Sequence, residues 1–313
     1  MGDRRTLVAV SVLAPREVPL GGTRQLLVRR TLPHRDLRTV GAWCFLDDYG
    51  PVDVTGTPGM QVPPHPHTGL QTVTWLLDGA VRHQDSLGSD ALVRPGELNL
   101  MTAGRGISHA ETTPVGATGA LRGLQLWVAL PARHRDTAPE FAHHGDLPRT
   151  EGEGLTVTVL LGSVAGAMSP ARTYTPIVGA EVVLAPGAHV GLPLERGFEH
   201  ALLALSDDLV VDGSRLERAS LQHLSPGRGR VMLTAGPTGG RAFLLGGEPF
   251  DEELLMWWNF VARSHDEVVQ AREEWMAAVD GAATRFGQVS GYDGGALPAP
   301  ALPTSRLRPR RSR

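Results

Sequence analysis

Two pairs of metal-binding side chains stand out in the sequence, and the members of each pair are two positions apart: His65-Pro66-His67 and His109-Ala110-Glu111. Residues i and i+2 of a β-strand point to the same face. If each pair lies on a strand that faces one interior, three imidazoles and one carboxylate converge from two directions. This donor set suits a divalent transition metal ion such as iron, manganese, nickel, cobalt or zinc. The sequence therefore predicts a metal site formed by His65, His67, His109 and Glu111.

The segment between the two pairs has the pattern of short strands joined by tight turns. Residues 70–77 are rich in β-forming residues and end at the turn dipeptide Asp78-Gly79, and residues 98–101 follow a second turn, Arg94-Pro95-Gly96-Glu97. The prolines at 63, 64 and 66 keep the first pair extended and remove backbone donors, which favours an edge strand or a barrel mouth. We therefore expect an antiparallel barrel whose metal site opens to a pocket.

These motifs resemble those of the pirin family, within the cupin superfamily. The matching pieces are L-P-H-R-D-L-R-T-V-G, F-L-D-D-Y-G-P, P-H-P-H-T-G, H-Q-D-S-L-G, R-P-G-E and M-T-A-G-x-G-I-x-H-x-E. The resemblance is specific from about Leu32 to Glu111 and looser as far as about Phe286. It implies an all-β bicupin fold of two antiparallel barrels, with the metal held by the residues that match His65, His67, His109 and Glu111.

The resemblance also implies an activity, because members of the family are known as quercetin 2,3-dioxygenases. The implied reaction is the oxygenative ring cleavage of a small aromatic flavonol by dioxygen, with Fe(II) as the preferred metal and Mn, Ni, Co or Zn as alternatives. Pirin-like proteins also include metal- and redox-dependent regulators that bind a protein partner. This non-enzymatic alternative stays open, as does a different oxygenase or isomerase activity, because all of them share the same motifs.

One position departs from the family pattern. The first cupin motif usually has a glutamate four residues after its second histidine, whereas this chain has Gln71. Glutamine cannot act as a carboxylate base, so we expect Glu111 to be the catalytic base. Gln71, Trp75 and Met101 are expected to line the substrate pocket, on the ground that they lie close to the motifs.

The pattern of the whole chain predicts five segments. These are an N-terminal metal-binding barrel (1–130), a linker (131–152), a degenerate C-terminal barrel (153–250), a strand and amphipathic helix packed on the barrels (251–290), and a Pro/Arg-rich tail (291–313).

The last two folded segments have distinct local signals. In the second barrel, Leu192-Pro193-Leu194 corresponds to the first histidine pair, and leucine does not bind such an ion, so we expect no metal there. In the helical segment, Ser264 and Glu267 form a capping box, and apolar residues recur behind it at helical spacing as far as Phe286.

Other chemistry-bearing residues are weaker candidates. His83, in H-Q-D, is expected to pack near the site or hydrogen-bond to it rather than bind the metal. Asp47 and Asp48 are expected to begin a solvated turn, with cation binding as the alternative. Residues 6–14 are expected to form a first strand rather than a signal peptide.

Composition restricts the partners and the compartment. The formal net charge is −3, so direct nucleic-acid binding is not expected. No stretch approaches the ~20 apolar residues that span a bilayer, so no membrane association is expected. The single cysteine, Cys44, lies between Trp43 and Phe45; we expect it to be buried, and its solitary presence fits a reducing cytoplasm.

Overall fold

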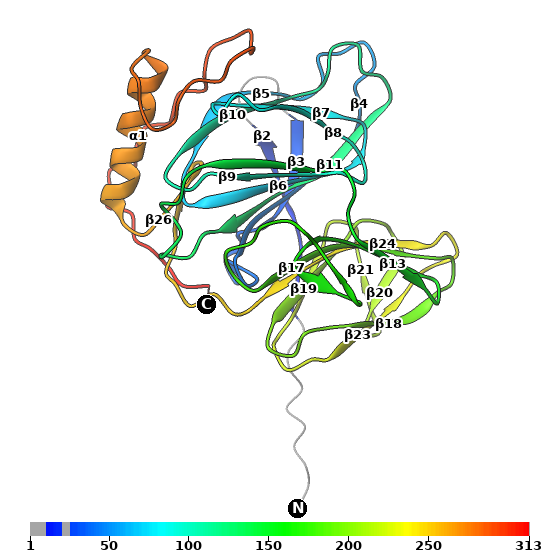
Figure 1. Cartoon of the computed structure of the whole chain (residues 1–313). Helices are drawn as coiled ribbons and strands as arrows, with labels where there is room; N and C mark the ends of the chain where they lie inside the picture. Colours follow the sequence, from blue (N-terminus) through cyan, green and yellow to red (C-terminus); the bar gives the residue numbers. More distant parts are fainter. Residues whose placement is uncertain (1–10, 21–25, 313) are drawn as a thin grey trace, which may run out of the picture. The chain divides into compact units, whose positions relative to one another are not determined.

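The computed structural model describes residues 11–20 and 26–312, which divide into two compact units (Figure 1). We name them the first barrel unit (residues 16–147 and 250–313) and the second barrel unit (residues 1–15 and 148–249). The strand expected at residues 6–14 lies partly outside the described residues. Within the described part, no helix has the length and apolar character that crossing a membrane requires.

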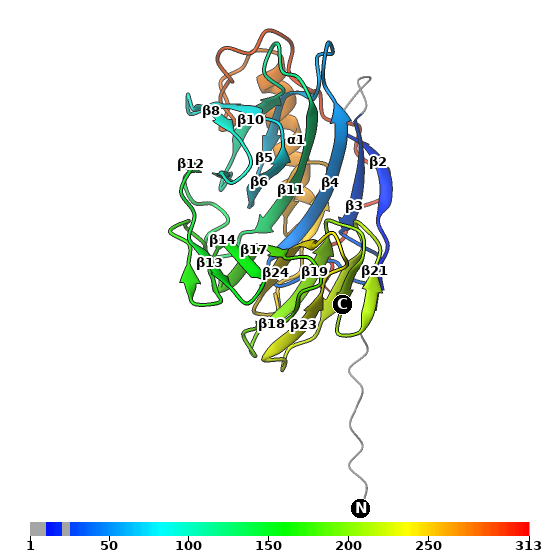
Figure 2. The same cartoon turned by 90° about the vertical axis from the view of Figure 1, so that its right-hand side faces the viewer.

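The first barrel unit is built from two antiparallel sheets (Figures 1 and 2). Its strands are β2 (Arg16–Leu20), β3 (Leu26–Leu32), β4 (Trp43–Asp53), β5 (Gln61–His67), β6 (Leu70–Asp78), β7 (Val81–Asp85), β8 (Asp90–Val93), β9 (Leu98–Thr102), β10 (Ile107–Thr112), β11 (Ala120–Ala129) and β12 (Glu140–His144). The seven-stranded sheet has the order β12-β9-β6-β11-β4-β3-β2, and the four-stranded sheet has the order β5-β10-β7-β8. Figure 2 shows β2, β3, β4 and β11 side by side. The predicted edge position of the first histidine pair is confirmed, because β5 ends the smaller sheet.

The C-terminal segment of this unit adds a hairpin and a helix. The hairpin consists of β25 (Leu255–Trp257) and β26 (Phe260–Ala262), and the helix α1 spans His265–Val279. Apolar side chains at helical spacing form the buried face of α1: Val268, Ala271, Trp275 and Ala278. Phe286 is fully buried, but it lies beyond the helix rather than on it as we expected.

The helix begins with a modified capping box. The hydroxyl oxygen of Ser264 accepts a hydrogen bond from the backbone N–H of Glu267, as predicted. The Glu267 carboxylate folds back to the backbone N–H of Arg263 instead of that of Ser264, at 2.9 Å. The first contact satisfies an amide of the first turn, and the second ties the residue before the N-cap to the helix.

Three segments differ from the sequence-based expectation. Residues 131–152 contain two strands, each at the edge of a sheet, where the polar side chains that indicated a linker are compatible with strand pairing. Asp47 and Asp48 lie within β4 and are buried, because Arg30 and Arg29 on β3 neutralise them. The tail pairs with the body of the unit through an isolated bridge between Leu254 and Arg310.

The second barrel unit repeats the same plan. Its strands are β1 (Ser11–Leu13), β13 (Arg149–Gly152), β14 (Leu155–Leu161), β15 (Ser163–Val164), β16 (Ala167–Met168), β17 (Ile177–Leu184), β18 (His189–Pro193), β19 (Glu199–Ala204), β20 (Leu209–Val211), β21 (Ser214–Leu216), β22 (Leu221–Leu224), β23 (Arg230–Thr234) and β24 (Gly240–Gly247). They form a seven-stranded sheet (β1-β22-β19-β24-β17-β14-β13), a four-stranded sheet (β18-β23-β20-β21) and a small hairpin. Leu192 and Leu194 are part of its apolar core. The predicted all-β architecture, with two barrels and one C-terminal helix, is confirmed.

Candidate metal centre

The strand register brings the two predicted ligand pairs together. β10 lies between β5 and β7, and His109 is directly opposite His65 on β5 and Asp85 on β7. A β-bulge follows His109, and Glu111 is opposite His83 on β7. Residues opposite each other in a ladder share a face of the sheet. All these side chains are buried.

Three histidines form a compact cluster. Candidate ligand atoms of His65, His67 and His109 lie within 4.8 Å of one another. The imidazole centroid of His65 is 4.4 Å from that of His109 and 5.0 Å from that of His67. The fourth predicted ligand, Glu111, belongs to a second cluster with His109 and His83. His109 is common to both.

The Nδ1 atom of each clustered histidine already has a contact. Nδ1 of His65 is 2.9 Å from the carbonyl oxygen of Pro63, and Nδ1 of His67 is 3.0 Å from that of Asn259. A carbonyl oxygen only accepts, so both nitrogens carry the proton, and Nε2 keeps its lone pair. Such contacts fix the ring orientation and the tautomer of metal-binding histidines.

His109 is oriented through a chain of side chains. Its Nδ1 is 3.4 Å from Nδ1 of His83, and Nε2 of His83 is 3.1 Å from the carboxylate of Asp85. Burial alone would raise the pKa of Asp85, but hydrogen bonds from His83 and Ser89 outweigh it and lower that pKa. The ionised Asp85 therefore accepts a hydrogen bond from Nε2–H of His83. Nδ1 of His83 then accepts from His109.

Burial keeps the clustered imidazoles neutral. Desolvation lowers the pKa of His65 to about 4, and it lowers the pKa values of His67 and His109 well below their usual range. Neighbouring imidazoles lower all three further. A proton therefore competes weakly for the lone pairs that a metal would use.

Glu111 differs from an exposed carboxylate. Burial raises its pKa, and the opposing effects of His83 and of a hydrogen bond from Thr74 are smaller. Thr74 Oγ1 donates to Glu111 Oε1 at 2.9 Å, which leaves Oε2 for another partner. A buried carboxylate with a raised pKa is a stronger base, which suits proton abstraction.

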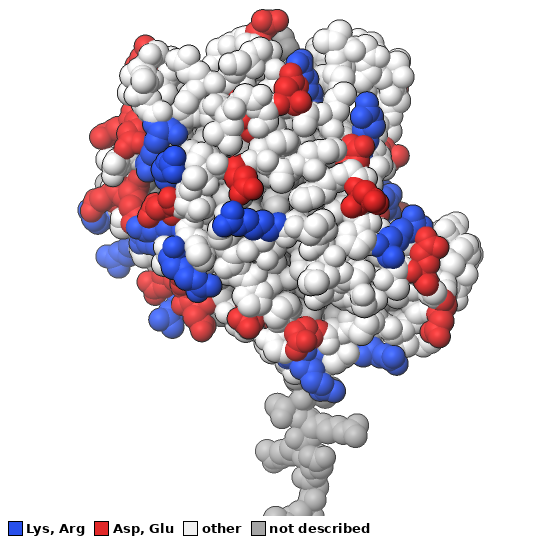
Figure 3. Space-filling model, viewed as in Figure 1, with Lys and Arg blue, Asp and Glu red and all other residues white. Residues whose placement is uncertain are grey.

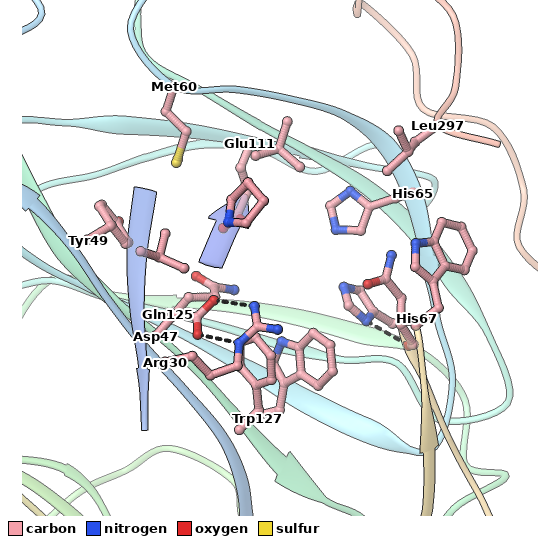
Figure 4. A pocket seen from close by; sticks show the side chains of 16 residues that line it. Arg30, Asp47, Tyr49, Met60, His65, His67, Glu111, Gln125, Trp127 and Leu297 are labelled. Carbon is pink, nitrogen blue, oxygen red and sulfur yellow. Dashed lines mark hydrogen bonds and ion pairs between the residues drawn. The ribbon is translucent and has the colours of Figure 1, made fainter. Parts of the chain in front are cut away.

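The cluster borders a cavity of about 340 Å³ in the first barrel unit (Figure 4). Both sheets and the C-terminal segment contribute to its walls, which are mostly apolar and aromatic. Its lining residues are Pro19, Val28, Arg30, Phe45, Asp47, Tyr49, Met60, Val62, His65, His67, Glu111, Gln125, Trp127, Trp258, Asn259 and Leu297. A cavity of this size with few polar groups is typical of a small-molecule site.

None of the three residues that we expected in the pocket lines this cavity. Thr74 on β6 points toward Glu111, so Trp75 and Gln71 point to the other face of the strand. The Gln71 amide is fully buried and donates to Thr102. Met101 lies in an apolar cluster with Ile107 and Trp127.

Sequence reasoning missed several residues around the centre. His83 was expected near the site, and it contacts His109. Asp85 was missed, although its two-residue spacing from His83, the same as in the ligand pairs, could have identified it. Arg30 and Asp47 have no local signal, because their contact depends on the register between β3 and β4. Trp258 comes from a hairpin remote in sequence.

The residues present fit a divalent metal ion. Nε2 of His109 is buried and has no hydrogen-bond partner among the described residues, a costly arrangement unless a metal uses the lone pair. His65 and His67 offer equivalent nitrogens beside it. Three neutral imidazoles and a nearby carboxylate are the donor set of mononuclear transition-metal centres.

Comparison with known proteins agrees with this description. The Pirin family model matches residues 25–128, and the Pirin C-terminal cupin domain model matches residues 179–280. A Pseudomonas aeruginosa protein provisionally named quercetin 2,3-dioxygenase is 42% identical over 288 residues, which are 92% of this chain and 89% of that protein.

Two further relatives extend the comparison. Human pirin is 30% identical over 88% of this chain and 93% of its own length. A crystal structure of quercetin 2,3-dioxygenase from Acinetobacter baumannii superposes with a TM-score of 0.90 at 40% identity, covering 96% of this chain and 97% of that one. From the two family matches and the long, highly similar relatives, this chain belongs to the pirin family and has its bicupin fold.

Proposed function

We propose that this protein is a metal-dependent dioxygenase that cleaves the ring of quercetin or a related flavonol with dioxygen. The observation that carries the proposal is the position of the histidine cluster. His65, His67 and Glu111 line an aromatic cavity of about 340 Å³, and His109 lies beside the two histidines in the same cluster. Relatives named as quercetin 2,3-dioxygenases, one of them a solved structure, support the same substrate class.

The proposed ligands are His65, His67, His109 and Glu111. Fe(II) is the metal that we propose first, and Mn, Ni, Co and Zn suit the same donors. When bound, such an ion supplies a Lewis acid that lowers the pKa of an adjacent substrate hydroxyl and, as Fe(II), can exchange an electron with dioxygen.

The protein's own residues have three roles in this proposal. Glu111 accepts the proton of the flavonol 3-hydroxyl, because its carboxylate lines the cavity beside the histidines. Thr74 holds the other carboxylate oxygen and so orients the base. Trp127 and Trp258 form aromatic parts of the wall and exclude water from the reacting ring.

The test measures metal content and turnover separately. Purified protein is analysed for metal, loaded anaerobically with Fe(II), and mixed with quercetin in air while the flavonol absorbance band and dioxygen uptake are followed. We expect the flavonol absorbance to fall while dioxygen is consumed in parallel. His65→Ala and His109→Ala should lose most of the metal, whereas His189→Ala should retain it, because His189 is exposed in the second barrel unit. A fully metallated protein without turnover would reject the activity.

The regulatory alternative now has less support. The absence of a carboxylate at position 71 does not favour it, because Gln71 lies away from the cavity and this substitution does not weaken the case for catalysis. Full metal loading without turnover, together with partner binding that changes between oxidising and reducing conditions, would favour the regulator instead.

A further inference from the structure

An ion pair lies in the wall of the cavity, apart from the histidine cluster. Nε and Nη2 of Arg30 each lie 2.7 Å from a different carboxylate oxygen of Asp47. The Asp47 side chain is 1% exposed, whereas that of Arg30 is 23% exposed. Both residues line the cavity (Figure 4). The carboxylate is therefore used by the arginine, while the arginine still reaches the open space.

The contact with Asp47 fixes the orientation of the Arg30 guanidinium and leaves one of its nitrogens outside the ion pair. A bidentate contact fixes the plane of a guanidinium group, and here it uses the edge formed by Nε and Nη2. Nη1 is not used in this contact. The Arg30 cation also lies 4.3 Å from the ring centroid of Phe45, which stacks on Trp127 at 4.0 Å. A charged donor is thus held at the margin of an aromatic surface.

A purely structural role does not explain why the pair faces the cavity. The adjacent residues of the same strands, Arg29 and Asp48, form a second ion pair at 3.1 Å. Because neighbouring residues on a strand alternate between faces, this second pair points away from the cavity, and neither member lines it. An ion pair that only links β3 to β4 therefore does not require Arg30 to have access to the cavity.

The two polar regions of the cavity come from different sheets. Arg30 and Asp47 lie on the seven-stranded sheet, and His65 and His67 lie on the four-stranded sheet. Facing sheets are typically ~10 Å apart, so an extended planar ring system has the length to touch both regions. Its end remote from the histidines would meet the Arg30 donor.

We propose that Arg30 is a specificity-determining residue that binds an anionic or strongly accepting oxygen on a planar aromatic ligand, at the end remote from the histidine cluster. The inference rests on the proposed function for the placement of the ligand. A site built to donate to such an oxygen rejects analogues that lack it, because the donor then loses its solvation without gaining a partner. Asp47 acts as the positioning residue for Arg30.

The test compares two ligands and two variants by equilibrium binding. The probes are quercetin and 3-hydroxyflavone, which share the 3-hydroxyl and 4-carbonyl groups, but 3-hydroxyflavone lacks the hydroxyls on the outer rings. Binding is measured without dioxygen, by quenching of tryptophan fluorescence and by calorimetry. Arg30→Gln is the test variant, and Arg29→Gln is the matched control on the opposite face of the same strand.

We expect the wild type to prefer quercetin. Arg30→Gln should weaken quercetin about ten- to hundred-fold, as loss of a charge-assisted hydrogen bond predicts, and leave 3-hydroxyflavone within about threefold. Arg29→Gln should keep the preference. Arg30→Lys, which retains the charge beside Asp47 but not the fork, should show an intermediate loss for quercetin alone, and it serves if Arg30→Gln does not fold.

Three results would overturn the inference: unchanged quercetin affinity in Arg30→Gln, equal weakening of both ligands, or no binding of either ligand to the wild type. Failure of the proposed function looks different. Arg30-dependent selection of quercetin without dioxygen uptake by the metal-loaded protein would support the inference and reject the dioxygenase activity.

Discussion

Nδ1 of His109 faces Nδ1 of His83 at 3.4 Å, so only one of these two nitrogens can carry a proton. Asp85 decides which, because its carboxylate accepts a hydrogen bond from His83 Nε2–H at 3.1 Å and so leaves His83 Nδ1 as the acceptor. His109 is then protonated on Nδ1, and its buried Nε2 presents a lone pair. Asp85 thus controls the tautomer of the candidate metal ligand His109 through the side chain of His83.

Replacement of Asp85 by Asn should weaken metal binding about 10- to 100-fold. Oδ1 of Asp85 accepts from the backbone N–H groups of Leu87 and Ser89, and asparagine can keep those contacts. Its amide then faces His83 as a donor, which reverses the tautomers and places a proton on Nε2 of His109. Competition with a chelator measures the affinity. Asp90→Asn is the control, since Asp90 pairs with Arg82 on the surface; equal affinities for the two variants would contradict the mechanism.

Trp258 should matter more for ligand binding than for stability. It lines the cavity with a φ of +52°, a left-handed conformation that is strained for a bulky residue. Trp258→Asn relieves that strain, because asparagine tolerates this region, and the relief offsets lost packing. We expect weaker quercetin binding in calorimetry and a small change in the free energy of unfolding. Trp275→Ala should instead lose about 3–5 kcal/mol of stability, since Trp275 is buried on α1.

Gly69 should tolerate no side chain. Its φ is +71°, and a Cβ there would lie 2.1 Å from the carbonyl oxygen of Val261 on β26. Gly69→Ala combines left-handed strain with overpacking, so we expect a loss of about 3 kcal/mol. Gly88 also has positive φ, but beyond its two chain neighbours no atom lies within 4 Å of the position that a methyl group would take there. Gly88→Ala should therefore cost only about 1 kcal/mol. Urea unfolding of both variants measures the difference, and equal losses would refute the clash.

The second barrel unit should lose stability in mild acid through His200. Burial lowers the pKa of His200 to about 4, only partly opposed by Glu195 and Glu199. The unfolded chain takes up this proton near its usual pKa of 6.5. Between these values the unfolded state binds more protons, so the stabilisation is complete above pH 6.5 and declines as the pH falls toward 4.

The measurement compares urea unfolding of metal-free protein at about pH 7.5 and about pH 5. His200→Gln should show a smaller loss on acidification than the wild type. His189→Gln, at an exposed position of the same unit, should behave like the wild type. An unchanged pH dependence in His200→Gln would show that other groups control it.

The sequence predicted what depends on local pattern. Strand alternation, turn dipeptides and the Ser264 cap are each readable within a few residues, and they indicated the barrels and the start of α1. The clustering of His65, His67 and His109 was also predicted, because two-residue spacing on strands decides which side chains share a face. Contacts between strands remote in sequence were not readable in this way.

The failures have one physical origin, the register between strands. Asp47 and Asp48 resembled a solvated turn because the arginines that neutralise them lie 17 and 19 residues earlier. Trp75 was assigned to the pocket by proximity in sequence, yet it adjoins Thr74, which points the other way. Local composition shows neither which residue neutralises a charge nor which face of a strand points into the cavity.

The edge position of β5 also has a consequence for solubility. Exposed sheet edges invite pairing with other chains and so promote aggregation. Pro63, Pro64 and Pro66 have no N–H to offer an incoming strand, and the carbonyl oxygen of Pro64 is already occupied by the N–H of Leu297. The same residues that hold the histidines extended therefore make this edge a poor template for self-association.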